Sequence, residues 1–344
     1  VALLFAGLGI QSSVAGVPSR QFQQIQQYQM IVSENPSATN QDKANLEEVL
    51  KGQDIQAYQK IYSKTLDKDF KGKAGLQTVT LMMTEKEDLT PFIHLQHHQQ
   101  ELTLKDGVVI TAKLAQLAGV KVGQTLEIEG KELTVAAITE NYVGHFIYMS
   151  QASYEQIYVQ LPQANTYLVS LRDTSATSIE RQAGLLMNQA AVSSVVQNAS
   201  AIRLFDSVAS SLNQTMTILV IVSVLLAIVI LYNLTNINVA ERIRELSTIK
   251  VLGFHNNEVT LYIYRETIVL SLVGIVLGLV SGFYLHQFLI QMISPATILF
   301  YPQVGWEVYV IPVAAVSIIL TLLGFFVNHH LRKVDMLEAL KSVE

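Results

Sequence analysis

Three long apolar runs dominate the second half of the chain, at residues 215–232, 267–293 and 308–327. None of them contains a Lys, Arg, Asp or Glu. A helix of about 20 apolar residues crosses the roughly 30 Å hydrocarbon core of a bilayer. A soluble core helix would need a polar face for water, and these runs offer none. We therefore predict membrane-spanning helices at residues 214–236, 266–293 and 308–328.

The first residues of the chain are also apolar, but their run is too short to cross a membrane. Residues 1–10 read VALLFAGLGI, without the Met and the basic residues that precede the apolar core of a signal peptide. We interpret residues 1–17 as the outer end of a truncated transmembrane helix whose beginning lies outside this sequence.

Basic residues near the ends of the spans indicate the orientation, since cytoplasmic loops carry an excess of Lys and Arg. The loop between the first two runs and the tail of residues 329–344 contain them, whereas residues 294–307 contain none. The basic residues are Arg242, Arg244, Lys250 and Arg265 in the loop and Arg332, Lys333 and Lys341 in the tail. Both segments are therefore predicted to be cytoplasmic, which places residues 18–212 outside the cell.

The segment of residues 18–212 has the charge content of an ordinary soluble domain. Alternating positions predict a half-exposed strand at residues 55–66, and a further strand is predicted at residues 166–171. Helices are predicted at residues 40–50 and 178–190. The predicted fold class is thus a membrane protein. It has an α+β extracellular domain inserted between the truncated first helix and a three-helix bundle, and residues 213–344 form the membrane part.

Few residues suggest catalytic chemistry. Cysteine is absent, and no G-x-x-x-x-G-K-[ST] phosphate-binding loop occurs. His94, His97 and His98 lie close enough in sequence to bind a metal, although a solvated polar edge is the favoured interpretation. His145 and Glu140 are near enough in sequence to form an acid–base pair. We predict no enzyme activity, no metal site and no cofactor in this chain. The net charge of −5 gives no indication of nucleic-acid binding.

The predicted cytoplasmic loop contains an amphipathic helix at about residues 238–253. Val239, Ile243, Leu246 and Ile249 repeat at helical spacing, and charged residues fill the other face. That face is either solvated or a docking surface for a cytoplasmic partner. The residues assigned to this surface are Glu241, Arg242, Arg244, Glu245, Lys250 and Gly253.

In the second apolar run, Gly274, Gly278 and Gly282 recur every four residues. Such spacing places them on one ridge of a helix, where small residues allow another helix to approach closely. The partner helix belongs either to this chain or to a second transmembrane half.

These features resemble a known family. The segment VAERIRELSTIKVLGF and the tail RKVDMLEALKSVE resemble the FtsX-like/MacB-like permease domain of ABC transporters. GVVITAKLAQLAGVKVGQTLEI and ENYVGHFIYMS resemble the extracellular domain of large Gram-positive members, which carry two permease repeats in one polypeptide. The chain resembles the second of these repeats.

The resemblance implies a permease subunit of the mechanotransmission type in the cell membrane. A cytoplasmic ABC ATPase dimer would bind the ATP and dock on residues 238–253. Further partners would be membrane lipid and the first permease repeat or a second permease. The resemblance implies export, extraction or sensing of a lipid, lipoprotein, peptide or antibiotic. The alternative is a non-transporting regulator that activates a cell-wall hydrolase.

Overall fold

The computed structural model describes residues 1–70, 74–85, 89–97, 100–105, 107–158, 160–241, 256–300 and 304–333. The chain divides into two compact units. As far as they are described, Val1–Val14, Ser210–Ile293 and Pro302–Glu344 form a helical unit, and Ala15–Ala209 with Ser294–Tyr301 form an α+β domain. Each unit is considered by itself.

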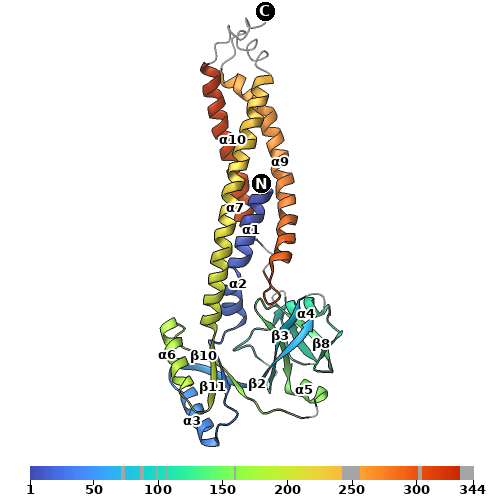
Figure 1. The fold of residues 1–344 in the computed structure, drawn as a ribbon, viewed down its shortest axis with the longest axis vertical. Helices are drawn as coiled ribbons and strands as arrows, with labels where there is room; N and C mark the ends of the chain where they lie inside the picture. Colours follow the sequence, from blue (N-terminus) through green and yellow to red (C-terminus); the bar gives the residue numbers. More distant parts are fainter. Residues whose placement is uncertain are drawn as a thin grey trace, which may run out of the picture. The chain divides into compact units, whose positions relative to one another are not determined.

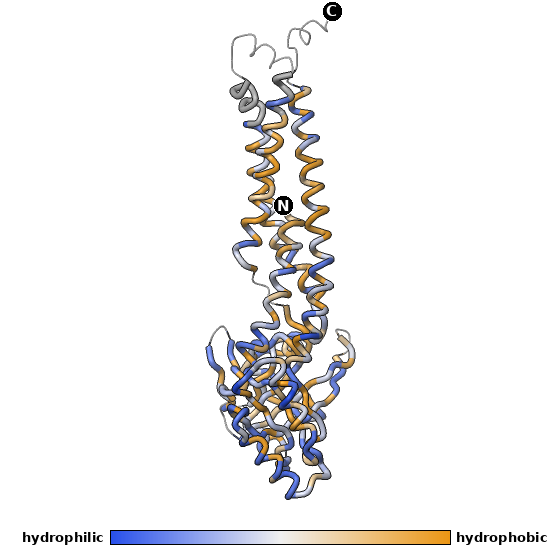
Figure 2. The backbone as a smooth tube through the Cα atoms, turned by 90° about the vertical axis from the view of Figure 1, so that its left-hand side faces the viewer, coloured by the Kyte–Doolittle hydropathy of each residue, from blue (hydrophilic) through white to orange (hydrophobic). Residues whose placement is uncertain are grey.

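The helical unit contains long apolar helices. They are α1 (Ala2–Ala15), α7 (Asn198–Glu241), α9 (Asn256–Ile293) and α10 (Glu307–Lys333), of which α7 begins in the α+β domain. The stretches Ala2–Ile25, Asn198–Glu241, Arg265–Ile293 and Glu307–Phe326 are long and apolar enough to cross a membrane. Apolar residues run along these helices in Figure 2, and many of their side chains are exposed, as lipid-facing side chains would be.

A nine-stranded mixed sheet organises the α+β domain, with the strand order β11-β1-β10-β2-β3-β9-β6-β8-β7. The strands are β1 (Met30–Glu34), β2 (Ile55–Phe70), β3 (Gly75–Thr84), β6 (Val108–Thr111), β7 (Thr125–Ile128), β8 (Lys131–Thr139), β9 (His145–Ser150), β10 (Thr166–Leu171) and β11 (Val192–Gln197). A separate small pair joins β4 (Gln96–His97) to β5 (Gln100–Glu101).

Two hydrophobic cores lie along this sheet. The first joins β1, β10 and β11 to α3 (Asn40–Leu50) and α6 (Ala176–Met187). The second joins β3, β6, β8 and β9 to α4 (Ala112–Ala118) and α5 (Gln151–Ile157). The 16-residue strand β2 serves both, because its first half pairs with β10 and its second half with β3 (Figure 1).

Several local predictions agree with the structure. The predicted helix at residues 40–50 is α3, and its N-cap is Thr39, whose side chain accepts from the Asp42 N–H. The predicted strand at residues 166–171 is β10. The predicted helix at residues 178–190 is α6, which begins two residues earlier and ends at Met187.

A short stalk follows α1 inside the α+β domain. It consists of α2 (Val17–Ser19) and a single turn of π-helix, η1 (Arg20–Ile25). π-Helical turns are rare and occur frequently at functional sites. After this turn the chain joins the domain, because the Gln27 N–H donates to the Phe92 carbonyl and the His94 N–H donates to the Ile25 carbonyl.

Candidate functional site

The residues predicted to dock on an ATPase fall mostly outside the described part of the chain. Glu241 is the last residue of α7 and its side chain is exposed. Arg242, Arg244, Glu245, Lys250 and Gly253 lie in residues 242–255, outside the described residues. The docking surface therefore stays a prediction.

The three glycines of α9 differ in their surroundings. A Cβ atom added at Gly282 would lie 2.8 Å from Cβ of Phe5, and one added at Gly278 would lie 2.6 Å from Cβ of Val1. One added at Gly274 would meet no atom within 4 Å among the described residues. Gly278 and Gly282 thus lie directly against α1 within the helical unit, and Gly274 does not.

One turn beyond Gly282, the same face of α9 presents a histidine to α1. His286 is fully buried, and its Nε2 lies 3.0 Å from the Ser13 hydroxyl. A Cβ atom at Gly9 would lie 2.7 Å from the His286 ring, so only glycine fits there without a shift. Sequence reasoning missed this residue, although a lone histidine in an apolar run is a recognisable signal.

The histidines singled out from the sequence do not form reactive groups. Among the described residues no set of three His, Cys, Asp or Glu side chains could hold a metal, and His98 lies outside those residues. His145 is 2% exposed, and within the described part of the chain neither of its ring nitrogens has a hydrogen-bond partner, so no bond to Glu140 is formed there.

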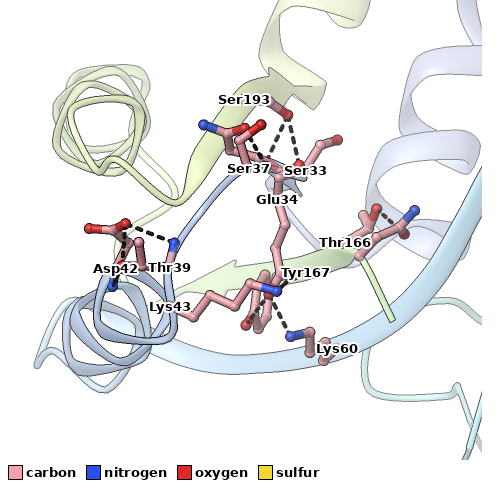
Figure 3. Close-up of polar contacts among 12 residues, drawn as sticks. Ser33, Glu34, Ser37, Thr39, Asp42, Lys43, Lys60, Thr166, Tyr167 and Ser193 are labelled. Atoms are coloured by element: carbon pink, nitrogen blue, oxygen red, sulfur yellow. Dashed lines mark hydrogen bonds and ion pairs between the residues drawn. The ribbon is translucent and has the colours of Figure 1, made fainter. Parts of the chain in front are cut away.

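A buried carboxylate ties α3 to the sheet, as Figure 3 shows. Glu34 on β1 is only 8% exposed, and its Oε1 accepts from the Tyr167 hydroxyl at 2.9 Å and from Lys60 Nζ at 2.5 Å. Lys43 Nζ lies 3.6 Å from the other oxygen. Burial alone would raise the pKa of Glu34, but the hydrogen bonds from Lys60 and Tyr167 and the two ammonium charges lower this pKa below its ordinary value. The cluster thus fastens α3 to β1, β2 and β10.

A second buried polar cluster surrounds the turn of residues 141–144, which precedes β9. Gln21 of the stalk is fully buried. Its Nε2 donates to Asn141 Oδ1 at 2.8 Å, and its Oε1 accepts from the backbone N–H of Tyr142 at 2.7 Å and of Val143 at 3.3 Å. Asn141 Nδ2 in turn donates to the carbonyls of Val143 and Gly144. The stalk is thereby fastened to this turn by a network in which every polar atom of the Gln21 side chain is used.

The opposite side of the same turn holds the segment between α9 and α10, residues 294–300, which we name the connector. The Gly144 N–H donates to the Thr297 carbonyl, and the Leu299 N–H donates to the Tyr142 carbonyl, both at 2.8 Å. Between these bonds Val143 and Ile298 form an antiparallel bridge. Although it links two apolar helices, the connector belongs to the α+β domain.

Lys113 of α4 binds the first residue of the connector, Ser294. It is 7% exposed, and its Nζ donates to the Ser294 hydroxyl at 3.2 Å, while that hydroxyl donates to the Ile298 carbonyl at 2.6 Å. Burial lowers the pKa of Lys113. Burial, and to a smaller degree the neighbouring Lys113 charge, lowers the pKa of His145, which keeps this imidazole neutral near pH 7.

Comparison with known proteins places the helical unit in a family. Residues 217–336 match the family described as FtsX-like permease C-terminal. An uncharacterized ABC transporter permease protein of Mycobacterium tuberculosis, Rv0987, is 24% identical over 203 residues, which are 56% of this chain and 23% of that protein. The matched stretch is therefore less than a quarter of the relative.

Two solved structures are also similar to parts of the chain. The periplasmic region of MacB from Actinobacillus actinomycetemcomitans is 11% identical, with a TM-score of 0.31, and the match covers 53% of this chain and 94% of that one. The extracellular domain of the ABC-type transporter YknZ from Gram-positive bacteria is 14% identical, with a TM-score of 0.29, and the match covers 49% and 98%. The sequence match to the permease family is the stronger finding: residues 217–336 match the FtsX-like permease C-terminal family, which confirms the family resemblance stated from the sequence.

Proposed function

We propose that this chain is the permease subunit of an ABC transporter that couples ATP hydrolysis by a separate cytoplasmic ATPase to its α+β domain outside the cell. The observation that carries the proposal is the match of residues 217–336 to the FtsX-like permease family, which covers the greater part of α7, α9 and α10. Four stretches long and apolar enough to cross a membrane support a location in the cell membrane.

The proposed orientation follows from the distribution of charge. Basic residues flank the cytoplasmic ends of α7, α9 and α10, and the connector has no Lys or Arg. In this orientation residues 18–212 lie outside, and residues 238–253 and 329–344 face the ATPase. The ATP site belongs to the ATPase, since this chain has no phosphate-binding loop of the Walker type.

A second permease half is part of the proposal. The relative from Mycobacterium tuberculosis is more than four times as long as the matched stretch, which leaves room for a first permease repeat. The substrate class is a lipid, lipoprotein, peptide or antibiotic, as the resemblance implies. A sparse charge content within the spans supports movement of an outer domain over passage of a solute through them.

The test is charge reversal at the predicted docking helix, Glu241→Arg with Glu245→Arg. Exposed ion pairs contribute only about 0–1 kcal/mol, whereas breaking a buried interfacial pair costs about 2–5 kcal/mol. The variant is expected to lose the ATPase by about 30-fold or more in affinity. Co-purification of the ATPase and ATP hydrolysis in proteoliposomes are measured. Glu132→Arg, at an exposed position of β8, is the control and is expected to behave as the unmodified chain.

Normal retention of the ATPase with unchanged turnover in the double variant would refute the coupling role of this helix. A complex that hydrolyses ATP and activates a cell-wall hydrolase, but moves no substrate between leaflets or out of the membrane, would replace transport with the regulatory alternative.

A further inference from the structure

Three segments of chain run between the helical unit and the α+β domain. The first is the continuation of α1 into the stalk, the second is α7 itself, and the third is the connector, which is joined to α9 at one end and leads to α10 at the other. Two of the three, the stalk and the connector, are bound to the same four residues of the α+β domain, 141–144. They come from regions of the sequence about 270 residues apart.

We propose that the turn of residues 141–144 is a fixed joint that fastens both the stalk and the connector to strand β9. Movement of α1 and of the α9–α10 pair then reaches β9 at one shared place. This inference rests on the proposed function, and it names the residues through which coupling reaches the outer domain. Gln21 is a positioning residue of this joint.

The bonds on both sides of the turn have the properties of a permanent attachment. The Gln21 network is buried, and hydrogen bonds in such surroundings are strong because breaking them leaves polar groups without water. On the connector side, Phe300 is only 4% exposed, so detachment would also expose an aromatic ring. Backbone pairing on both flanks of Val143 and Ile298 fixes their register.

The strand that follows the turn is well placed to receive a force. β9 is flanked on both sides, in parallel by β3 and antiparallel by β6, and Ile147 and Met149 on it lie in the second hydrophobic core. A displacement of residues 141–144 therefore acts on an interior strand, which moves its neighbours with it, and not on a loose edge.

The connector side can be locked covalently. Val143 and Ile298 oppose each other without hydrogen bonds between them, a position where Cα atoms are typically about 4.5 Å apart and within the range of a disulfide. The chain has no cysteine, so Val143→Cys with Ile298→Cys introduces its only two thiols. If the joint is fixed, oxidation of this pair leaves the ATP-dependent response of β9 and the rate of ATP hydrolysis unchanged within about twofold. Such a change is well below the tenfold that 1.4 kcal/mol represents.

The connector can also be released. Leu299→Pro removes the N–H that donates to the Tyr142 carbonyl, and so one of the two backbone bonds beside the Val143–Ile298 bridge, which favours detachment by about tenfold or more. Ala296→Pro is the matched control, because Ala296 is the second residue of the turn closed by the Ile298 N–H and the Pro295 carbonyl, where proline is favoured. Adding the cysteine pair to the Leu299→Pro chain allows the connector to be reattached by oxidation.

The experiment uses the full chain with its ATPase in proteoliposomes and measures two quantities. These are the ATP-dependent change in hydrogen exchange of the peptide that contains β9, and the rate of ATP hydrolysis. We expect the exchange response to be retained in the oxidised cysteine pair, lost in Leu299→Pro, and recovered in the combined variant only after oxidation. Loss of the response on oxidation of the simple cysteine pair would overturn the inference, as would a normal response in Leu299→Pro.

The two failures can be told apart. If the unmodified chain binds its ATPase but shows no ATP-dependent change in β9, the proposed function fails and the joint with it. If the unmodified chain responds and the variants contradict the expected pattern, only the joint is refuted. Because the cysteine pair in the otherwise native chain can overturn the inference alone, poor folding of Leu299→Pro does not decide the test.

Discussion

The side chain of Gln21 is the most direct target for testing the stalk side of the joint. Replacement of Gln21 by Leu leaves the N–H groups of Tyr142 and Val143 and the Oδ1 atom of Asn141 without their partner in a buried place. An unsatisfied buried polar group costs about 1–3 kcal/mol. The Val143 bond is long at 3.3 Å and contributes least. The expected loss of local stability is about 2–5 kcal/mol.

Gln24→Leu is the matched control on the same π-helical turn. Its side chain is exposed and no hydrogen bond to it is formed among the described residues, so the same chemical change is expected to stay within about 0.5 kcal/mol. Both variants are expected to insert and fold, since the two hydrophobic cores of the domain do not include either residue.

The assay is native-state hydrogen exchange of the peptide covering residues 139–150 in the full chain in detergent. Local opening governs exchange there, and a loss of 2 kcal/mol or more accelerates it by about 30-fold or more. Exchange in Gln21→Leu that stays within about threefold of Gln24→Leu would refute the reasoning, because the network around residues 141–144 would then contribute nothing to holding the turn.

Two further predictions concern packing and charge. Gly282→Ala places a methyl group 2.8 Å from Cβ of Phe5 and is expected to lower the stability of the detergent-solubilised chain by about 1–3 kcal/mol in thermal unfolding. Gly274→Ala, where no atom of the described residues lies within 4 Å, is expected to lower it little. Equal effects of the two substitutions would refute packing at Gly282. Tyr167→Phe removes a hydrogen bond to a buried carboxylate and is expected to cost about 1.5–3 kcal/mol, against little for Tyr58→Phe. The folded state lowers the pKa of Glu34, so the stability that its carboxylate contributes is present above about pH 4.3 and is lost as the pH falls through the folded-state pKa. Acid unfolding of Tyr167→Phe should therefore begin at a higher pH than that of the unmodified chain.

The elements that the sequence predicted well are those specified by local pattern. The apolar runs in α7, α9 and α10 are recognisable from composition alone, and α3 follows from the helical spacing of residues 40–50. β10 is also recognisable as a β-branched and aromatic segment between polar residues. In each of these segments a single stretch of chain contains the whole signal.

β9 shows why other elements were missed. Its sequence, HFIYMS, does not alternate between apolar and polar positions, and no strand was predicted there. Side chains on both faces of this interior strand are mostly buried, so the strand lacks the polar positions of a half-exposed one, and only its partners β3 and β6 identify it. The role of the connector could not be predicted either, because nothing in its sequence PATILF, residues 295–300, indicates a contact with residues 141–144.

The candidate site was predicted least well because polar residues acquire their role from partners far away in sequence. Gln21 is one of six glutamines between residues 19 and 29, and the printed spacing gives no reason to prefer it over the others. Its distinction is that its carboxamide meets Asn141, 120 residues later. Conversely, the three clustered histidines attract attention in the sequence but belong to no metal site among the described residues.

The three connections between the units differ in kind, and this difference limits what each can transmit. α7 is one continuous helix of 44 residues, about 66 Å long, that begins directly after the edge strand β11 and ends at the predicted docking segment. In the proposed orientation, a displacement of its cytoplasmic end is carried along the axis by the helix itself. At its other end, Asn198 donates to the carbonyls of Tyr28 and Gln29, which lie between the stalk and β1. The stalk and the connector instead reach β9 through the side-chain and backbone bonds at residues 141–144. If coupling operates as proposed, α7 acts on the first hydrophobic core through β11 and the joint acts on the second core through β9. The long strand β2, which belongs to both halves of the sheet, is then the element that a relative movement of the two cores must bend.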